Sequence, residues 1–432
     1  MKLLKLLFIL YSSFIFSQKY IPIDTIDKEK RDAAVSTFQQ SNKIYVESLK
    51  KNYPGKDGKL LVKSNEEFSK EFEEEIKEGK FCYDPRFLSY IEQVLNGLRK
   101  NNPLIPSNSK IMVSKDPSLN AYCLPNGTFV FNMGLFYWLE NDDQLVSVLS
   151  HELSHKILNH SEKSELAIAK EELSTKTKVR SLKKQKYKKH QAAFSLFKSR
   201  LYATGELRKK HEYQADSLGL VLMKNASLNE GAFIDALQLM EKYDTIKPVG
   251  LKSEIYKKIF NLPNQPFKKE WLEMEDFSKY DYSLYEEKIN KDSTTSHPKT
   301  DYRIVRLKND FPELKKSFKK SLPTEEFKKL QEIAEYEQVP SMYFNEQYGE
   351  GIYLCLIRLQ ESPSDKYYLE WLGKCFEKIY EGRKNYQLNR YLDHLEPKEQ
   401  SESYQQFLNF MWNLSLEEIG NIVAHYTKKS AG

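Results

Sequence analysis

The chain has 432 residues, of which 40% are hydrophobic and 30% charged, and a formal net charge of +6. This composition excludes an intrinsically disordered chain, and the mild positive charge gives no reason to expect nucleic-acid binding. The length allows two domains. The four cysteines, Cys82, Cys123, Cys355 and Cys375, are too few for a disulfide scaffold and lack zinc-finger spacing. Cys355 and Cys375 either form a disulfide or are buried free thiols, and the sequence leaves both alternatives open.

Residues 1–17 are predicted to be a secretory signal peptide. Lys2 and Lys5 give a basic start, residues 6–16 are an apolar run, and Ser17 is a small residue at the expected cleavage site. The run is too short to span a bilayer, and an uncleaved anchor is the alternative. Removal of the two lysines lowers the formal charge from +6 to +4. No later stretch approaches about 18 uninterrupted apolar residues. We therefore expect an exported protein of the periplasm or cell envelope, with no transmembrane span in the mature chain.

Residues 18–84 are predicted to form an N-terminal helical segment. Within it, residues 26–80 are rich in charge and helical in character. Asp84 and Pro85 then provide an N-cap and a first-turn proline, which predict the start of a further helix. The buried face of that helix is expected to comprise Phe87, Ile91, Val94, Leu95 and Leu98.

A small sheet is predicted after this helix. Residues 110–113 are a candidate strand, and the aromatic and β-branched run 128–132 is another. The Asn126-Gly127 pair ahead of the second strand is typical of a tight turn. A strand just ahead of the next helix is well placed to bind an extended peptide along its edge, and an ordinary core strand fits the pattern equally well.

Residues 141–160 are predicted to form the helix that carries the chemistry. Asn141 is a good N-cap, and Asp142 and Asp143 place negative charge in the first turn. Residues 151–155 read His-Glu-Leu-Ser-His, the pattern H-E-x-x-H. At roughly 100° per residue, one face of the helix is an apolar seam formed by Val146, Leu149, Leu153 and Ile157.

The two histidines of this pattern, His151 and His155, fall nearly opposite the seam and one turn apart, so they can bind one metal ion. Glu152 lies about 100° round from His151, which suits a carboxylate that takes a proton from a metal-bound water. His160 is placed on the seam side, as a packing or hydrogen-bonded histidine and not a ligand. The alternative is an exposed helix whose histidines merely share a face, so the pattern needs a third ligand.

Residues 161–210 are predicted to be a basic helical insertion. Between Lys176 and Lys189 there are eight Lys or Arg residues and no acidic residue. One interpretation is a solvated helical arm. The other is a lid, or a docking surface for an acidic partner or a membrane.

The stretch after the insertion contains a candidate for the third ligand. Glu212 and Asp216 are four positions apart and therefore share one face of a helix. Glu212 is the candidate zinc ligand, and Asp216 can accept a hydrogen bond from the far nitrogen of a ligating histidine. His211 is a competing ligand by residue type, but it faces elsewhere.

Two further residues are candidates for a role close to the metal. His297 can cover the metal or stabilise an oxyanion, and Arg303 can stabilise charge or hold the acidic helix. The alternative is a plain helix N-terminus whose Arg303 forms a salt bridge. Residues 311–432 are predicted to be a helical C-terminal region. One degenerate register around Pro363 indicates a tetratricopeptide-like arrangement there.

As an ordered set, these motifs resemble the HtpX-like and CAAX-prenyl-protease-like zinc metallopeptidases, metallopeptidase family forty-eight. The resemblance covers about residues 85–310. It rests on residues 116–128, 134–136, 145–160, 212–216 and 296–304. It implies a mainly α fold with a small β-sheet (α+β), a gluzincin-type zinc metallopeptidase domain followed here by an all-helical C-terminal region. It also implies one Zn²⁺ ion per chain bound by His151, His155 and Glu212, with Glu152 as the catalytic base.

The resemblance further implies an endopeptidase that hydrolyses exported or envelope proteins, with further envelope-protein partners on the helical tail. Members with several membrane spans have apolar helices where this chain has residues 161–210, so we expect no intramembrane chamber. Ser154 and Asn126 replace glycines that are frequent in the family, and neither change touches a ligand. The alternative function is a non-catalytic chaperone or assembly scaffold. A purely structural zinc site is a weaker interpretation, because such sites usually fill four positions with protein ligands.

Overall fold

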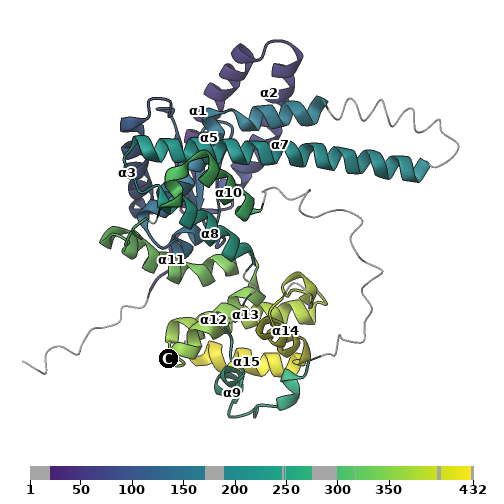
Figure 1. Cartoon of the computed structure of the whole chain (residues 1–432). Coiled ribbons are helices and arrows are strands. Elements are labelled where there is room, and N and C mark those ends of the chain that lie inside the picture. The colour runs from purple at the N-terminus through teal and green to yellow at the C-terminus, as the bar shows by residue number, and fades with distance from the viewer. Residues whose placement is uncertain are drawn as a thin grey trace, which may run out of the picture.

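The structure is a computed structural model that describes residues 20–170, 189–245, 248, 250–274, 299–316, 318–396 and 400–429. The predicted signal peptide, most of the basic run 176–189 and His297 lie outside the described residues. The described part forms two lobes joined by a helix (Figure 1). The prediction of a mainly helical protein with one small sheet, followed by a helical C-terminal region, is confirmed.

The first lobe is built from helices around a four-stranded sheet. Its elements are α1 (Lys28–Asn52), α2 (Lys56–Lys77), β1 (Phe81–Cys82), α3 (Pro85–Asn101), β2 (Lys110–Ser114), β3 (Ala121–Cys123), β4 (Thr128–Asn132), α4 (Met133–Trp138), α5 (Asp142–Ile157), α7 (Lys189–Asn225), α8 (Gly231–Thr245), α10 (Thr300–Asp310), η5 (Pro312–Lys315) and most of α11 (Glu325–Phe344). Residues 160–170 are also helical.

The strand order is β1-β2-β4-β3, with β2 and β4 parallel and the two outer pairs antiparallel. The predicted turn leads from β3 into β4: Gly127 has φ +85°, which favours glycine, and the Asn126 Oδ1 atom accepts a hydrogen bond from the Thr128 N–H at 3.0 Å. This arrangement leaves β3 at one edge of the sheet, next to α5.

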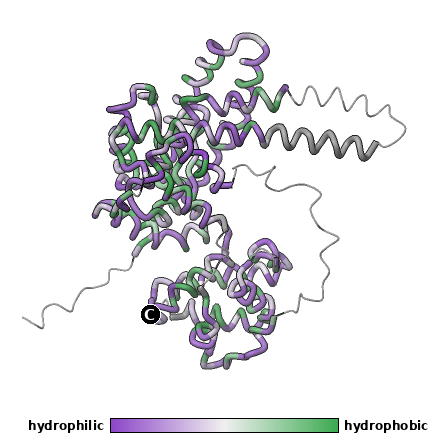
Figure 2. The backbone as a smooth tube through the Cα atoms, in the orientation of Figure 1, coloured by the Kyte–Doolittle hydropathy of each residue, from purple (hydrophilic) through white to green (hydrophobic). Residues whose placement is uncertain are grey.

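The sheet is buried on both faces, which explains the unbroken apolar run of β4. Phe129 and Phe131 point into the main core with α3, α4 and α5, whereas Val130 between them packs in a smaller core with α1 and α2. Successive residues of a strand face opposite sides of a sheet, so both sides need apolar residues here. Hydrophilic and apolar residues alternate along the covering helices (Figure 2).

The cap prediction for α5 is confirmed. The Asn141 side chain accepts a hydrogen bond from the Gln144 N–H at 3.1 Å, and Asp142 and Asp143 occupy the first turn. The two acids also tie the helix to the chain ahead of α11. Asp142 accepts hydrogen bonds from the Thr324 N–H at 2.8 Å and the Thr324 hydroxyl at 2.7 Å, and Asp143 accepts one from Ser321. The start of the helix is therefore held from two sides.

The second lobe has its own core. Its elements are α9 (Glu254–Phe260), η1 (Lys269–Leu272), α12 (Tyr348–Glu361), α13 (Lys366–Lys384), η6 (Leu388–Arg390), α14 (Glu402–Asn413) and α15 (Leu416–Lys429). Residues 251–272 belong to this core, although they lie between two first-lobe helices in the sequence. Cys355 and Cys375 are buried here as free thiols. Helices α12 and α13 lie on either side of Pro363, and the tetratricopeptide-like assignment stays a prediction.

Helix α11 connects the lobes, because Phe327 near its start belongs to the first core and Val339 near its end to the second. The N-terminal segment crosses the same junction. Glu337 Oε1 accepts hydrogen bonds from the Tyr20 hydroxyl at 2.6 Å and the Ile23 N–H at 2.8 Å. Tyr20 packs against both cores, so the first described residue of the chain is part of the joint.

Candidate metal centre

Two helices bring the predicted ligands together. Helix α5 presents His151 and His155, and α7 presents Glu212 and Asp216, each pair one turn apart. A glycine sets the closeness of the two helices: a Cβ atom at Gly219 would lie 3.1 Å from the His151 backbone nitrogen, tighter than ordinary packing. The close approach of the two helices at Gly219 therefore brings the imidazoles of His151 and His155 opposite the carboxylate of Glu212.

The three candidate ligand atoms converge on one point. The His151 and His155 Nε2 atoms are 3.0 Å apart, and they lie 3.5 and 3.4 Å from the two Glu212 carboxylate oxygens. Donors at the usual zinc bond lengths in a tetrahedral site lie roughly 3.3 Å apart. The donor set and its spacing therefore fit a zinc ion with a fourth position free. Of the described residues, these three are the group of histidine, cysteine and acidic side chains able to hold a metal.

Asp216 and Arg303 contact two of the candidate ligands, His151 and Glu212. The His151 Nδ1 atom lies 2.9 Å from Asp216 Oδ1. Arg303, on α10, donates two hydrogen bonds to the same carboxylate, from Nε at 2.8 Å and from Nη2 at 2.6 Å. Its Nη1 atom lies 3.5 Å from Glu212. Asp216 is 1% exposed and Arg303 6%. Of the roles foreseen for Arg303, the structure therefore shows a buried salt bridge to the acidic helix.

The two histidines of this cluster differ in pKa. Burial lowers the pKa of His151, but the Asp216 and Glu212 carboxylates outweigh burial and raise this pKa to about 10. Burial and the neighbouring His151 lower the pKa of His155 to about 3. Burial raises the pKa of Asp216, but Arg303 and His151 outweigh burial and hold it below its ordinary value. The cluster thus favours a protonated His151 beside a neutral His155.

His160 is packed and hydrogen-bonded and is not part of the ligand cluster, as predicted, but it lies beside His155 and not on the seam side. That prediction continued one helix through residue 160, whereas α5 ends at Ile157 and Asn159 has φ +53°. The chain turns there and brings the His160 Nδ1 atom within 2.9 Å of the His155 Nδ1 atom. Asparagine just past a helix end is a known stop signal, so the sequence did contain the information. His211 also lies closer than foreseen, with its ring stacked on His160 at a centroid distance of 4.0 Å.

The ligands open into a cavity of about 850 Å³. Glu152 lines it beside His151 and His155, where a catalytic base is required. One wall comprises residues 118–123, which lead into and include β3. Apolar side chains of α8 also line it, namely Phe233, Ala236, Leu237 and Met240. The cleft thus combines a sheet edge, an apolar surface and the candidate ligands.

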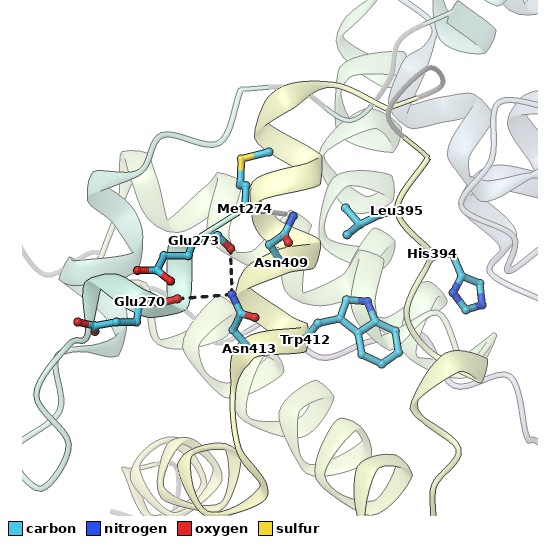
Figure 3. A pocket seen from close by; sticks show the side chains of 8 residues that line it. All are labelled: Glu270, Glu273, Met274, His394, Leu395, Asn409, Trp412 and Asn413. Carbon is cyan, nitrogen blue, oxygen red and sulfur yellow. Dashed lines mark hydrogen bonds between the residues drawn. The ribbon is translucent and has the colours of Figure 1, made fainter. Parts of the chain in front are cut away.

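A second hollow lies in the other lobe, lined by Glu270, Glu273, Met274, His394, Leu395, Asn409, Trp412 and Asn413 (Figure 3). The Asn413 side chain donates hydrogen bonds to the backbone carbonyls of Glu270 and Glu273, so it fastens η1 to α14. The Asn413 side chain of this hollow therefore has a structural role.

A histidine pair one turn apart, a carboxylate from a second helix and a glutamate beside them in an open cleft define a metallopeptidase site. The family model of peptidase family M48 matches residues 89–310, about half of the chain, and the chain belongs to this family. The chain therefore has the domain and the candidate metal ligands of a metallopeptidase family.

A relative is found over a short segment. Over 78 residues the chain is 32% identical to the beta-barrel assembly-enhancing protease of Yersinia pestis. This segment covers 18% of the chain and 16% of that protein. No helix among the described residues is long and apolar enough to cross a membrane.

Proposed function

We propose that this chain is a zinc-dependent metalloendopeptidase. The convergence of His151, His155 and Glu212 at zinc-ligand spacing supports the proposal most strongly. The three residues would hold one zinc ion per chain through two neutral imidazoles and one carboxylate. Asp216 would fix the tautomer and orientation of His151, and Arg303 would neutralise Asp216. We assign no role to His297, which lies outside the described residues.

The bound ion would supply Lewis acidity, which acidifies water and polarises a carbonyl group. In this proposal Glu152 accepts the proton of the attacking water and then passes it to the leaving amine. The outer edge of β3 binds the substrate backbone as an added strand, a common mode of peptide recognition. The apolar side chains of α8 that line the same cavity then accept the side chain of an apolar substrate residue. An extended peptide that runs past the ligands in both directions is cleaved internally, as an endopeptidase requires.

We further propose that the protein is exported and acts on proteins of the periplasm or cell envelope. The apolar N-terminal segment of the sequence supports export, and the name of the Yersinia pestis relative supports the choice of envelope proteins. In the proposed domain order, residues 18–84 form an N-terminal helical segment and residues 85–310 the peptidase domain. Residues 311–432 form the helical C-terminal region, although most of α11 packs in the first lobe and residues 251–272 pack in the second. The helices of the second lobe contact envelope partners.

The decisive test uses Glu152→Gln, which keeps the size of the side chain and removes its basicity. The variant is expected to retain about one zinc per chain and to lose at least about 10²-fold in hydrolysis of an unfolded protein such as casein. Glu212→Ala is expected to lose zinc as well as hydrolysis. Normal hydrolysis by Glu152→Gln would refute its role as base. A wild-type chain that binds casein without chelator-sensitive cleavage would instead favour the scaffold function.

A further inference from the structure

The two candidate histidine ligands are supported in different ways on the side that faces away from the ligand cluster. The Nδ1 atom of His151 faces the Asp216 carboxylate at 2.9 Å. The Nδ1 atom of His155 faces another imidazole nitrogen, the Nδ1 atom of His160, at 2.9 Å. Two ring nitrogens at this distance form a hydrogen bond only if one carries a proton and the other does not.

The ligand role of His155 decides where that proton lies. Its Nε2 atom points into the cluster, 3.0 Å from His151 Nε2 and 3.4 Å from Glu212 Oε1. A neutral imidazole that offers its Nε2 lone pair to a metal carries its proton on Nδ1. His155 Nδ1–H therefore donates, and His160 Nδ1 accepts. This assignment rests on the proposed metal ligands.

The same logic extends one residue further. A neutral His160 that accepts at Nδ1 carries its own proton on Nε2. That atom lies 3.2 Å from the Gln214 side-chain oxygen, which is an acceptor. In this series of hydrogen bonds, from His155 through His160 to Gln214, each contact pairs one donor with one acceptor. Gln214 is exposed, so water can replace it, whereas His160 is 3% exposed and has no such substitute.

The ring of His160 is held by packing as well. It stacks on His211 with an interplanar angle of 7° and a centroid distance of 4.0 Å. The His211 Nδ1 atom is 3.2 Å from the Ser164 hydroxyl, so a separate contact holds His211. We propose that His160 is a positioning residue that fixes the tautomer and ring orientation of His155, with Gln214 as its terminal acceptor and His211 as its stacking support.

The test compares His160→Phe with His211→Phe in the full chain. Phenylalanine at either position keeps an aromatic ring in the stack, and only His160→Phe removes the acceptor for His155. Zinc affinity is measured by competition with a chromophoric chelator. His160→Phe is expected to weaken zinc binding about 10–100-fold, the usual effect of losing a hydrogen-bond partner of a metal ligand. His211→Phe is expected to change it by less than about threefold, since the acceptor remains.

A spectroscopic readout separates positioning from packing. In the chain labelled with ¹⁵N-histidine and loaded with ¹¹³Cd²⁺, His155 is expected to bond the metal through Nε2 and to show a slowly exchanging Nδ1–H. The Nδ1–H signal is expected to exchange rapidly in His160→Phe. If His160→Phe does not fold, Gln214→Leu serves instead, with faster exchange of the His160 Nε2–H as the expected result. Metal bonded to His155 through Nδ1, unchanged zinc affinity in a folded His160→Phe, or an unchanged His160 signal in Gln214→Leu would each overturn the proposal. In any of these cases the proposed peptidase function still stands, provided that the wild type binds zinc. Failure of the wild type to bind zinc would refute that function.

Discussion

Replacement of Arg303 by leucine tests whether a buried ion pair stabilises the metal centre. Arg303 donates two hydrogen bonds to Asp216, and both side chains are almost fully buried. Leucine fills much of the space but leaves the Asp216 carboxylate without its guanidinium. Loss of one partner of a buried pair usually costs about 3–5 kcal/mol, because the other charge stays buried and unpaired. The His151 Nδ1 atom remains 2.9 Å from Asp216, so we expect the lower end, about 3 kcal/mol.

This penalty is large enough to measure as a change in melting temperature. The peptidase family match spans residues 89–310. For a domain of that size each kcal/mol shifts the melting temperature by about 2–4 °C, so Arg303→Leu is expected to melt roughly 6–12 °C lower. Differential scanning calorimetry of the metal-free chain measures this shift without interference from metal loss.

Two further variants decide what the shift means. Arg306 lies on the same helix, and its exposed guanidinium is 3.6 Å from Asp310. Arg306→Leu is therefore expected to cost no more than about 1 kcal/mol. The double variant Arg303→Leu with Asp216→Asn removes both charges, and it is expected to recover part of the lost melting temperature. A melting temperature for Arg303→Leu within about 2 °C of the wild type would refute the reasoning.

Three other predictions follow from the charges of the described residues. Because the metal-free pKa of His151 is raised to about 10, zinc binding near pH 7.5 is expected to release about one proton from this residue, measured by titration calorimetry in buffers of different ionisation enthalpy. The same raised pKa stabilises the folded metal-free chain. This stability is fully present below pH 6.5, the ordinary pKa of histidine, and is lost as the pH rises through about 10. A melting temperature of the metal-free chain that stays constant from pH 7 to 10 would contradict this. At the joint between the lobes, Glu337→Ala removes the acceptor of the Ile23 N–H. The hydrogen–deuterium exchange of the Ile23 N–H is expected to accelerate more than about tenfold, because hydrogen bonds to charged groups contribute about 1.5–3 kcal/mol.

Local sequence patterns predicted the elements of the peptidase site. The Asn141 cap, the Asn126-Gly127 turn and the one-turn spacing of His151 and His155 depend on residues close in the chain, and the structure contains all three. The pairing of these histidines with Glu212 needed more, because the two helices meet only in the folded chain. The pairing was predictable because a catalytic zinc site with two histidines needs a third protein ligand, and the Glu212 carboxylate is of a suitable type.

Other features depend on contacts that no local pattern encodes. The second lobe takes residues 251–272 into its core, and sequence order alone assigns them to the peptidase domain. The contact of Tyr20 with Glu337 joins positions more than three hundred residues apart. His160 is a different case, because its misplacement came from one overlooked helix end at Asn159. A single backbone conformation there brings His160, expected as a packing or hydrogen-bonded residue on the seam side, next to a candidate ligand.

The charge distribution gives a further argument for a cation at this site. Glu212 and Asp216 place two carboxylates next to His151, and Arg303 offsets the one that faces away from the ligand cluster. The remaining carboxylate and the Nε2 atoms of both histidines surround the ligand position. Asp216 and Glu212 raise the pKa of His151, so its imidazolium form is stabilised and can donate a hydrogen bond from Nε2 to the His155 Nε2 atom at 3.0 Å. A divalent ion that takes this position satisfies the same three atoms at once. The helices thus hold the donors in place before the metal binds, which limits the conformational entropy lost on binding.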